Sequence, residues 1–325
     1  MSAGEYSRVI QYTIRRLLAT IPVLLLTSVI VFGLMRLIPG DPVELLVENA
    51  FTEVSEELIE KLRAQHGLDR PLYTQYLIWL GNFLKGDLGW SYLNNQAVWD
   101  IIRPRILPTV QIGLLGLVFA MLVAVPVGMF AAMHPRTWKD WLSTAGALIG
   151  AAMPYFLTGG LLIYLVSLRL RWLPASGYVP LFDDPVASLR SSILPALTLS
   201  FVLAAVIMRQ TRSSFVEVLQ HAYIRTARAK GLAMRTVIVA HAFKNAILPV
   251  VTVLGIELGS VFSGAVITET IFAVPGIGRL LVDSILARDY STIQAVVLFI
   301  TLAVVVANLL VDLAYGWLDP RIRRS

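Results

Sequence analysis

The feature that most constrains this chain is a series of long apolar runs separated by shorter charged segments. Of its 325 residues, 57% are hydrophobic and only 15% are charged, and the mean hydropathy is +0.72. A soluble domain carries about a quarter charged residues, whereas about 20 apolar residues in helical form cross the roughly 30 Å hydrocarbon core of a membrane. The runs do not alternate apolar and polar positions, as the strands of a membrane barrel would. The sequence therefore predicts an all-α polytopic membrane protein.

Six of these runs are predicted to be transmembrane helices. They cover Leu17–Ile38, Thr109–Met133, Leu142–Leu168, Ile193–Met208, Leu248–Phe272 and Thr292–Tyr315. We expect Pro126, Pro154 and Pro195 to kink their helices, because proline has no N–H to donate. The first run follows Arg15-Arg16 and is not followed by a small-residue cleavage site. We therefore expect it to be retained as a helix and not removed as a signal peptide.

The Lys and Arg residues predict the orientation. With a cytoplasmic N-terminus, the inner segments hold 15 of these residues in about 70 positions and the outer segments hold 11 in about 110. The inner segments are 1–16, 134–141, 209–245 and 317–325, and the outer ones are about 39–105, 169–192 and 273–291. Lys and Arg favour the cytoplasmic side, so both termini are predicted to be cytoplasmic. The same bias accounts for the net charge of +6, and we expect no nucleic-acid partner.

The first outer loop separates two parts of the chain. We expect the cytoplasmic N-terminus with the first span over residues 1–38, an extracytoplasmic loop over 39–108, and a five-helix core over 109–325. That core contains an inner segment, residues 209–247.

The outer loop itself is predicted to contain two short helices. The first runs from an N-cap at Ser55 to a stop at Gly67, and the second has Pro71 at its first position. In the second helix an aromatic stripe recurs at helical spacing, and it is formed by Leu72, Tyr76, Trp79 and Phe83. We expect this stripe to lie at the headgroup interface, and packing on neighbouring helices is the alternative.

The inner segment between the fourth and fifth spans is strongly basic. Residues 213–230 lack proline and glycine and are rich in alanine and arginine, which predicts a helix. Gly231 interrupts it, and residues 233–246 are predicted to form a second helix. Small Ala227 and Ala229 would let a partner approach closely, while the arginines would pair with its acidic or carbonyl groups. A basic loop that only sets topology or binds anionic lipid heads is the alternative.

This segment resembles the inner loop of bacterial ABC importer permeases. The resemblance rests on Tyr223-Ile-Arg-Thr-Ala-Arg-Ala-Lys-Gly231, followed by His241-Ala-Phe-Lys-Asn-Ala246 and Pro249. More narrowly, it is similar to the dipeptide/oligopeptide/nickel group, of the dipeptide permease B-subunit type. Further segments resemble that group in the same order, namely Ile38-Pro-Gly-Asp-Pro42, Gly86-Asp-Leu-Gly-Trp-Ser91, Thr268-Glu-Thr-Ile-Phe272, Pro275-Gly-Ile-Gly-Arg279, Arg288-Asp-Tyr290, Asn308-Leu-Leu-Val-Asp312 and Asp319-Pro-Arg-Ile-Arg323.

The resemblance implies a type I ABC importer permease fold and a transport function without catalysis in this chain. It also implies the partners: a second homologous permease subunit, two cytoplasmic ABC ATPase subunits that bind ATP and Mg, an extracytoplasmic solute-binding protein, and the lipid of a bacterial cytoplasmic (inner) membrane. No G-x-x-x-x-G-K-[ST] sequence occurs, so we expect no nucleotide in this chain. No metal or other cofactor is expected in it either, because it has no cysteine and its four histidines are not at chelating spacing.

In that family the inner loop docks into a cleft on the ATPase. The coupling residues that the resemblance assigns are Tyr223, Arg225, Thr226, Ala227, Arg228, Lys230, Gly231, His241 and Asn245. The chain departs from the wider superfamily, which has Glu-Ala-Ala where Arg225-Thr-Ala227 stands and Ile-x-Leu-Pro where His241-Ala-Phe-Lys244 stands. Both departures are typical of the peptide/nickel group, and they leave open which contacts replace those of the glutamate.

Polar and small residues in the fifth span are candidates for the translocation pathway. Glu257 lies mid-way along this span, and a carboxylate at membrane depth normally faces a cavity or a partner. The alternative is that Glu257 pairs with an Arg or Thr side chain at a helix interface and has no role in transport. The small residues are expected to form one face, either for helix packing or for solute, and they are Gly255, Gly259, Ser260, Ser263 and Gly264. The candidate pathway residues are Glu257, Gly259, Ser260 and Ser263. Glu269, near the outer end, is expected to be exposed at the interface.

Peptide is the expected solute, with nickel chelates, glutathione or another small solute as alternatives in the same architecture. The resemblance implies that the binding protein delivers solute to the outer mouth. Closure of the ATPases on ATP would then move the 222–245 element and switch the pore from inward- to outward-facing. We expect the outer segments 169–192 and 273–291 to be flexible and to supply the receptor surface and outer gate.

Two other classes of protein are weaker alternatives. An ion-coupled secondary transporter would show internal repeats around a midplane ion site, and no convincing repeat is evident. An intramembrane enzyme would need a Ser/His, paired-Asp or His/Glu constellation within the spans, and none is evident.

Overall fold

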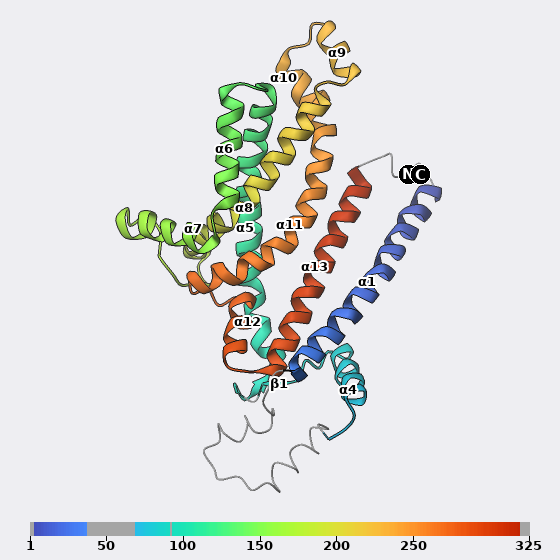
Figure 1. The fold of residues 1–325 in the computed structure, drawn as a ribbon, viewed down its shortest axis with the longest axis vertical. Helices are drawn as coiled ribbons and strands as arrows, with labels where there is room; N and C mark the ends of the chain where they lie inside the picture. The colour runs from blue at the N-terminus through green and yellow to red at the C-terminus, as the bar shows by residue number, and fades with distance from the viewer. Residues whose placement is uncertain (1–2, 38–68, 92, 319–325) are drawn as a thin grey trace. The chain divides into compact units, whose positions relative to one another are not determined.

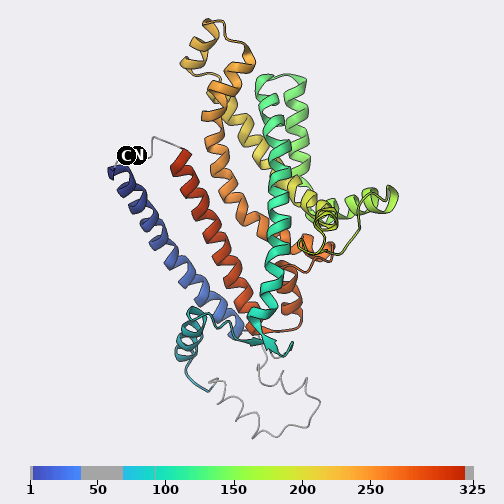
Figure 2. The same cartoon turned by 180° about the vertical axis from the view of Figure 1, so that it is seen from behind.

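The computed structural model describes residues 3–37, 69–91 and 93–318, and this part of the chain is almost entirely helical (Figures 1 and 2). Its long helices are α1 (Ala3–Leu37), α5 (Val98–Met133), α8 (Pro185–Val218), α11 (Phe243–Ile271) and α13 (Tyr290–Leu318). The shorter helices are α4 (Leu72–Leu84), α6 (Trp138–Ala152), α7 (Tyr155–Leu162), α9 (Ala222–Ala229), α10 (Met234–Thr236) and α12 (Ile277–Leu286). Two π-helical turns, η1 (Ile163–Arg169) and η2 (Val237–Ala242), and two antiparallel two-residue strands, β1 (Trp90–Ser91) and β2 (Gln96–Ala97), complete it.

The all-α polytopic class is confirmed. Five described helices are long and apolar enough to cross a membrane, and a bent pair of helices would make a sixth span. The pair is Trp138–Ala152 with Tyr155–Arg169, and its halves meet at 102°. The predicted span Leu142–Leu168 is therefore a bent pair of helices, and the kink expected at Pro154 is confirmed as a break of the helix. The reason is Pro154, which has no N–H and forces Met153 out of the helical region, to a ψ of 119°.

α8 is about twice as long as the predicted span Ile193–Met208. It begins after Asp184, whose carboxylate accepts hydrogen bonds from the backbone N–H groups of Val186 and Ala187, both at 3.0 Å. Pro185 takes the first helical position, which suits a residue without an N–H. The prediction was too short because the first turns of α8 are polar in sequence, although their serines are buried in the structure.

The chain divides into two compact units, and the first is built around α8. It comprises Met1–Arg16, Leu107–Arg279 and Val304–Ser325. α8 is the most buried of the candidate spans, and it packs against α11, α6 and α7. Its core includes Leu203, Ile207 and Met208 of α8 together with Val250 and Val261 of α11. At one end of this unit α9 and α10 lie near the turn that joins α5 to α6 (Figure 1).

The second unit comprises Leu17–Ile106 and Leu280–Ala303. In it α4 packs on α1 through the predicted aromatic stripe. The rings of Tyr76 and Trp79 lie 5.5 and 5.6 Å from the ring of Phe32, and the hydroxyl groups of Tyr76 and Ser28 are 2.8 Å apart. The structure thus favours the packing alternative over the interfacial one. Pro71 is the N-cap of α4, so this helix begins one position later than predicted. The predicted helix from Ser55 to Gly67 lies outside the described residues.

Candidate functional site

The inner segment forms a short helix, α9, that is anchored to the chain by two side chains. Ile224 is fully buried and Ala227 is 7% exposed. They join an apolar cluster from the end of α8, η2 and the start of α11, which contains Phe215, Val218, Val237, Ile238, Ala242 and Ala246. Ala227 therefore packs on the chain's own core, and the prediction that it leaves room for a partner is wrong. Ala229 is exposed, as that prediction requires.

The other face of α9 is basic and exposed. It carries Tyr223, Arg225, Thr226, Arg228 and Lys230, all of them exposed. Gly231 follows with a φ of +78°, in the left-handed region that glycine adopts without strain. The bend predicted at Gly231 is thus confirmed. The predicted continuous helix over 213–230 is wrong, since α8 ends at Val218 and the chain turns before α9 begins.

α9 is also tied to the inner end of α11. The side-chain amide of Asn245 donates a hydrogen bond to the Tyr223 hydroxyl over 2.8 Å, so the structure brings together two coupling residues that are 22 positions apart. His241 is exposed at the same end, in the last turn of η2. α10 and η2 lead into α11 without a gap, so the predicted second helix continues into the transmembrane helix.

An ion pair fastens the start of α6 to the C-terminal part of α8. Arg212 donates two hydrogen bonds to Asp140, at 2.5 and 2.7 Å. The Asp140 side chain is 6% exposed and that of Arg212 is 33% exposed. Asp140 also accepts from the backbone N–H of Arg136 at 3.0 Å, which fixes the turn between α5 and α6. This pair was not found in the sequence, because its partners lie 72 positions apart.

A stripe of exposed residues runs along α11 at intervals of three or four. It consists of Asn245, Pro249, Thr252, Ile256, Ser260, Ser263, Ile267 and Thr270, of which only Ser260 is half-buried. Five of these eight side chains carry a hydroxyl or amide group. By contrast, the large exposed side chains of α1 from Leu18 to Leu34 are all apolar, as expected where a helix meets lipid. The stripe on α11 is therefore suited to an aqueous path or to a subunit interface.

The small residues of α11 do not form the single face that was predicted. Gly255 packs against α13, where an added Cβ would lie 2.7 Å from Val311 Cγ1. Gly264 packs against α8 and α7, where an added Cβ would lie 2.8 Å from Leu199 Cδ2 and 2.9 Å from Tyr155. The two glycines are nine residues apart, which places them on opposite sides of a helix with 3.6 residues per turn. Their role is close helix packing.

The four candidate pathway residues are spread around α11. Ser260 and Ser263 belong to the exposed stripe. Gly259 lies nearer to α13, since an added Cβ there would be 3.8 Å from Val304. Glu257 is half-buried and, being two residues from Gly259, points to the other side of the helix. The structure therefore does not bring all four to one surface, and a pathway role for Ser260 and Ser263 stays a prediction.

Glu269 is fully buried, so the prediction that it is exposed at the interface is wrong. Its carboxylate accepts a hydrogen bond from Thr109 Oγ1 of α5 at 2.5 Å and from the backbone N–H of Arg279 at 2.9 Å. Thr109 Oγ1 in turn accepts from the backbone N–H of Ile277 at 2.8 Å. Glu269 and Thr109 thereby hold the start of α12 against the outer ends of α11 and α5. We call these groups the outer brace.

Two glycines allow the outer brace to close. A Cβ added at Gly276 would collide with the Glu269 carboxylate, and one added at Gly278 would lie 2.6 Å from Val266 Cα. The motifs Thr268-Glu-Thr-Ile-Phe272 and Pro275-Gly-Ile-Gly-Arg279 therefore form one structural site. Polar groups that are buried in an apolar region are costly unless they are paired, which explains why the backbone approaches the carboxylate so closely.

A second polar cluster secures the other outer segment. Tyr178 donates to Gln111 Oε1 at 2.8 Å, and Gln111 donates to Ser188 and Ser192 of α8, each at 2.9 Å. The backbone N–H of Gly177 donates to the carbonyl of Phe272 at 2.8 Å. Burial raises the pKa of the Tyr178 phenol above its usual value. These bonds hold segment 170–179, so the prediction that this outer segment is flexible is not supported.

In the second unit two further motifs meet. Ser91 donates a hydrogen bond to the buried carboxylate of Asp289, and Thr292 donates to the same carboxylate from its hydroxyl at 2.7 Å. Gly86-Asp-Leu-Gly-Trp-Ser91 and Arg288-Asp-Tyr290 thus touch at the start of α13. A cluster of three or more possible metal ligands does not occur among the residues that the structure describes.

Two family models match the chain. The binding-protein-dependent transport system inner membrane component matches residues 124–324, and the N-terminal part of such membrane components matches residues 9–113. Residues 86–91 and Thr109 fall within the N-terminal match, and residues 268–279 fall within the other. A match over more than half of a chain identifies its family.

Individual relatives agree with the family models. The glutathione transport system permease protein GsiC of Escherichia coli (strain K12) is 41% identical over 314 residues, which cover 97% of this chain and 99% of that protein. The dipeptide transport system permease protein DppB of the same strain is 40% identical over 342 residues, with the same coverage. A crystal structure of an amino acid ABC transporter with histidines is similar with a TM-score of 0.48 and 14% identity, covering 66% of this chain and 93% of that one. The chain therefore belongs to the family of binding-protein-dependent transport system inner membrane components, and it is a multi-pass permease subunit of an ABC importer of the bacterial inner membrane.

Proposed function

We propose that this chain forms half of the translocation pathway of an importer for di- or oligopeptides and that α9 is its contact with an ATPase subunit. The other half is a second homologous permease, each permease contacts one ATPase, and an extracytoplasmic binding protein delivers the solute. ATP and Mg bind to the ATPases and not to this chain. Because the chain belongs to the permease family of ABC importers, we no longer consider an ion-coupled secondary transporter.

The anchoring of α9 is the observation that carries the coupling proposal. The exposed face of α9 presents three cations, while Ile224 and Ala227 fix its opposite face to the ends of α8 and α11. A contact made on the cationic face is therefore transmitted to transmembrane helices and is not absorbed by a loose loop. The Tyr223–Asn245 hydrogen bond links the same face directly to α11.

α11 supplies the proposed pathway surface. Its exposed stripe of hydroxyl and amide groups starts at Asn245, beside α9, and ends at Thr270, beside Glu269 of the outer brace. Polar groups exposed at membrane depth normally face a cavity or a partner. We assign Ser260 and Ser263 to the pathway on this basis and place Glu257 away from it.

The names of the relatives support small peptides as the solute. One relative is a dipeptide permease and another is a glutathione permease, and glutathione is itself a tripeptide. Glutathione is the second candidate, because the permease named for it is similar over the same 97% of the chain at 41% identity. Uptake of a labelled dipeptide and of labelled glutathione into proteoliposomes separates the two.

The outer hollow beside Tyr178 is the proposed receptor contact. It has a volume of about 670 Å³, and Arg171, Trp172 and Arg190 are among its lining residues. Arg171 and Arg190 are exposed, so they can pair with acidic side chains of a binding protein. Because segment 170–179 is held by the hydrogen bonds of Tyr178 and Gly177, this surface is pre-formed.

Reversing charge on α9 is expected to uncouple the importer. In proteoliposomes that contain the whole importer, Arg225→Glu/Arg228→Glu should reduce binding-protein-stimulated ATPase activity at least fivefold, because two attractive contacts become repulsive. Gly231→Pro should have a similar effect, since proline does not adopt a φ of +78°. The readout is the ratio of stimulated to basal phosphate release.

Two controls make this result specific. Arg225→Lys/Arg228→Lys preserves the charge and should retain most of the stimulation. Arg136→Glu reverses one charge on an exposed residue of the α5–α6 turn and should leave stimulation within twofold. Full stimulation in the Arg225→Glu/Arg228→Glu variant, with the complex intact, would contradict a coupling role for α9. The basic residues would then serve only to set the membrane topology.

A further inference from the structure

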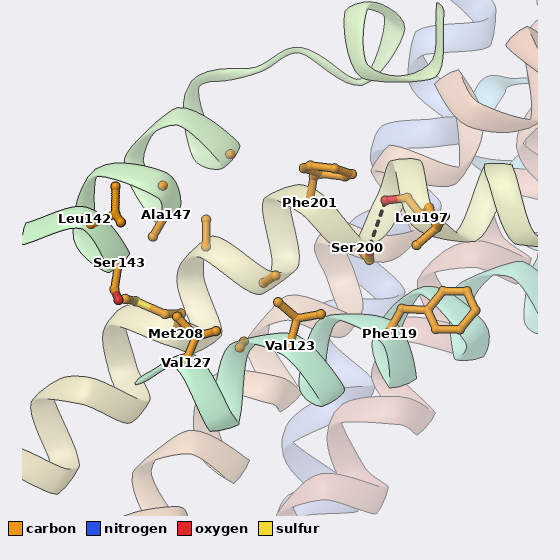
Figure 3. A pocket seen from close by; sticks show the side chains of 15 residues that line it. Phe119, Val123, Val127, Leu142, Ser143, Ala147, Leu197, Ser200, Phe201 and Met208 are labelled. Carbon is orange, nitrogen blue, oxygen red and sulfur yellow. Dashed lines mark hydrogen bonds between the residues drawn. The ribbon is translucent and has the colours of Figure 1, made fainter. Parts of the chain in front are cut away.

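An apolar groove between α5, α6 and α8 is not explained by solute transport. It has a volume of about 360 Å³ (Figure 3), and its walls are aliphatic and aromatic side chains, among them Val123, Val127, Ala147, Leu197, Phe201 and Met208. Both hydroxyl groups that line it are already bonded to their own helices: Ser143 donates to Lys139 O at 2.9 Å and Ser200 donates to Leu197 O at 2.7 Å. The groove therefore offers little to a peptide and is suited to a hydrocarbon chain.

The length of the groove matches one leaflet of a membrane. Its α8 wall extends from Leu197 to Met208, which corresponds to about 16 Å at a rise of 1.5 Å per residue. The hydrocarbon core of a bilayer is about 30 Å thick, so the groove covers about half of it. In Figure 3 Met208, Leu142 and Ser143 lie together at one end, and Leu197 and Phe119 lie at the other.

Three cationic residues lie within one helical turn of the groove lining at the end near Met208. Lys139 is one turn before Ser143 on α6, and Arg209 is one turn after Ala205 on α8, where Ser143 and Ala205 both line the groove. Arg212, one turn after Met208, adds a third cation, and the adjacent Asp140 subtracts one charge. Two positive charges thus remain at this mouth. The opposite end, at Leu197 and Phe119, lies within the apolar parts of α8 and α5 and has no such cluster among the described residues.

Aromatic residues near the same end of the groove indicate that it lies at the level of the lipid headgroups. Trp138 and Trp141 at the start of α6 are each 71% exposed, and exposed tryptophan is typical of the membrane–water interface. Lys139 Nζ lies 5.6 Å from the centre of the Phe130 ring of α5, so the ends of α5 and α6 meet here. The basic mouth is on the predicted cytoplasmic side, where anionic lipids attract Lys and Arg.

We propose that this groove binds one anionic phospholipid, with an acyl chain between α5, α6 and α8 and the phosphate beside Lys139 and Arg209. The site is independent of the solute and of the coupling contact. Two parts of the site bind two parts of the lipid: the apolar groove binds the acyl chain, and the positively charged mouth binds the headgroup. A transmembrane helix of the second permease is the competing occupant, and the charges at the mouth favour the lipid.

The test uses native mass spectrometry on the whole importer, purified in a mild detergent. The complex is incubated with phosphatidylglycerol and phosphatidylcholine of identical acyl chains, so that only the headgroup charge differs. We expect the complex to retain phosphatidylglycerol about tenfold more than phosphatidylcholine. Equal retention of the two lipids would overturn the proposal.

Two pairs of variants assign the retained lipid to this groove. Gly146 lines it and has open space where a Cβ would be, so Gly146→Leu should place its side chain in the groove and remove the retained phosphatidylglycerol. Gly160, which is equally open but lies on α7, provides the control Gly160→Leu. Lys139→Gln/Arg209→Gln should make the two lipids equal in retention, whereas Arg103→Gln, at an exposed arginine in the first turns of α5, should not.

The competing occupant has its own readout. A photoreactive side chain at Phe201, which is 41% exposed in the groove wall, should capture lipid in membranes. Capture of the second permease subunit, or unchanged lipid retention in Gly146→Leu, would contradict the proposal.

Discussion

Glu269→Ala is expected to lower the free energy of unfolding by about 3–5 kcal/mol and to reduce solute uptake more than tenfold. Thr109 and Arg279 each lose this acceptor inside the protein, at about 1–3 kcal/mol for each buried group. The side chain is fully buried, so its removal also leaves a cavity. Uptake falls because the start of α12 is no longer held against α11 and α5. The measurements are uptake by the reconstituted importer and the apparent Tm of the purified chain, for which a decrease of about 5–10 °C is expected.

Neighbouring variants show whether the hydrogen bonds or the volume matter. Glu269→Gln keeps the shape and one acceptor oxygen and should give a smaller decrease in Tm. Gly278→Ala keeps the carboxylate but forces a Cβ to within 2.6 Å of Val266 Cα, so it should reproduce much of the loss. Thr270→Ala is the control for the Tm, because its exposed hydroxyl bonds to its own helix, at Val266 O. If Glu269→Ala keeps its Tm within 1 °C of the parent protein, the outer brace has no stabilising role.

Arg212→Leu is expected to cost about 2–4 kcal/mol of stability. It leaves the Asp140 carboxylate, only 6% exposed, with the backbone N–H of Arg136 but without the two hydrogen bonds and the charge of Arg212, and breaking a buried ion pair is strongly destabilising. The value is below the full range for buried pairs because Arg212 is one-third exposed and water offsets part of the loss. The apparent Tm in detergent should fall by several degrees.

A double variant separates charge burial from packing. Arg212→Leu/Asp140→Leu removes both charges and should be more stable than Arg212→Leu alone, since replacing a whole buried pair is often nearly neutral. Arg103→Leu, at an exposed arginine, should change the Tm by less than about 2 °C. A double variant less stable than Arg212→Leu would show that the pair contributes mainly through its packing contacts with α6 and α8.

Elements that depend only on neighbouring residues could be predicted from the sequence. The apolar runs predicted the long helices, Pro71 predicted the start of α4 to within one residue, and Gly231 predicted the bend after α9. Pro154 was recognised as a possible kink. Its effect, a 102° turn, depends on how α6 and α7 pack against α8, and a single sequence does not contain that information.

The polar clusters were not predicted because their partners are distant in sequence. Glu269 was expected at the surface since it lies near the end of a span, but its partner Thr109 is 160 residues away. The one available signal was the pair Gly276 and Gly278, because closely spaced glycines indicate a close approach of backbone to another group. In the same way, the buried face of α9 depends on Ile224, whose role becomes visible only beside Phe215 and Val237.

α11 is secured at both of its ends, and this limits how the protein can move. Its inner end is bonded to α9 through Asn245, and its outer end is bonded to α5 and to the start of α12 through Glu269. Between these points the helix is continuous. A displacement of Asn245 along the helix axis is therefore passed to Thr109 and the start of α12, unless α11 bends at Pro249 or one of the two attachments breaks. We therefore expect movements of α9 and of the start of α12 to be correlated.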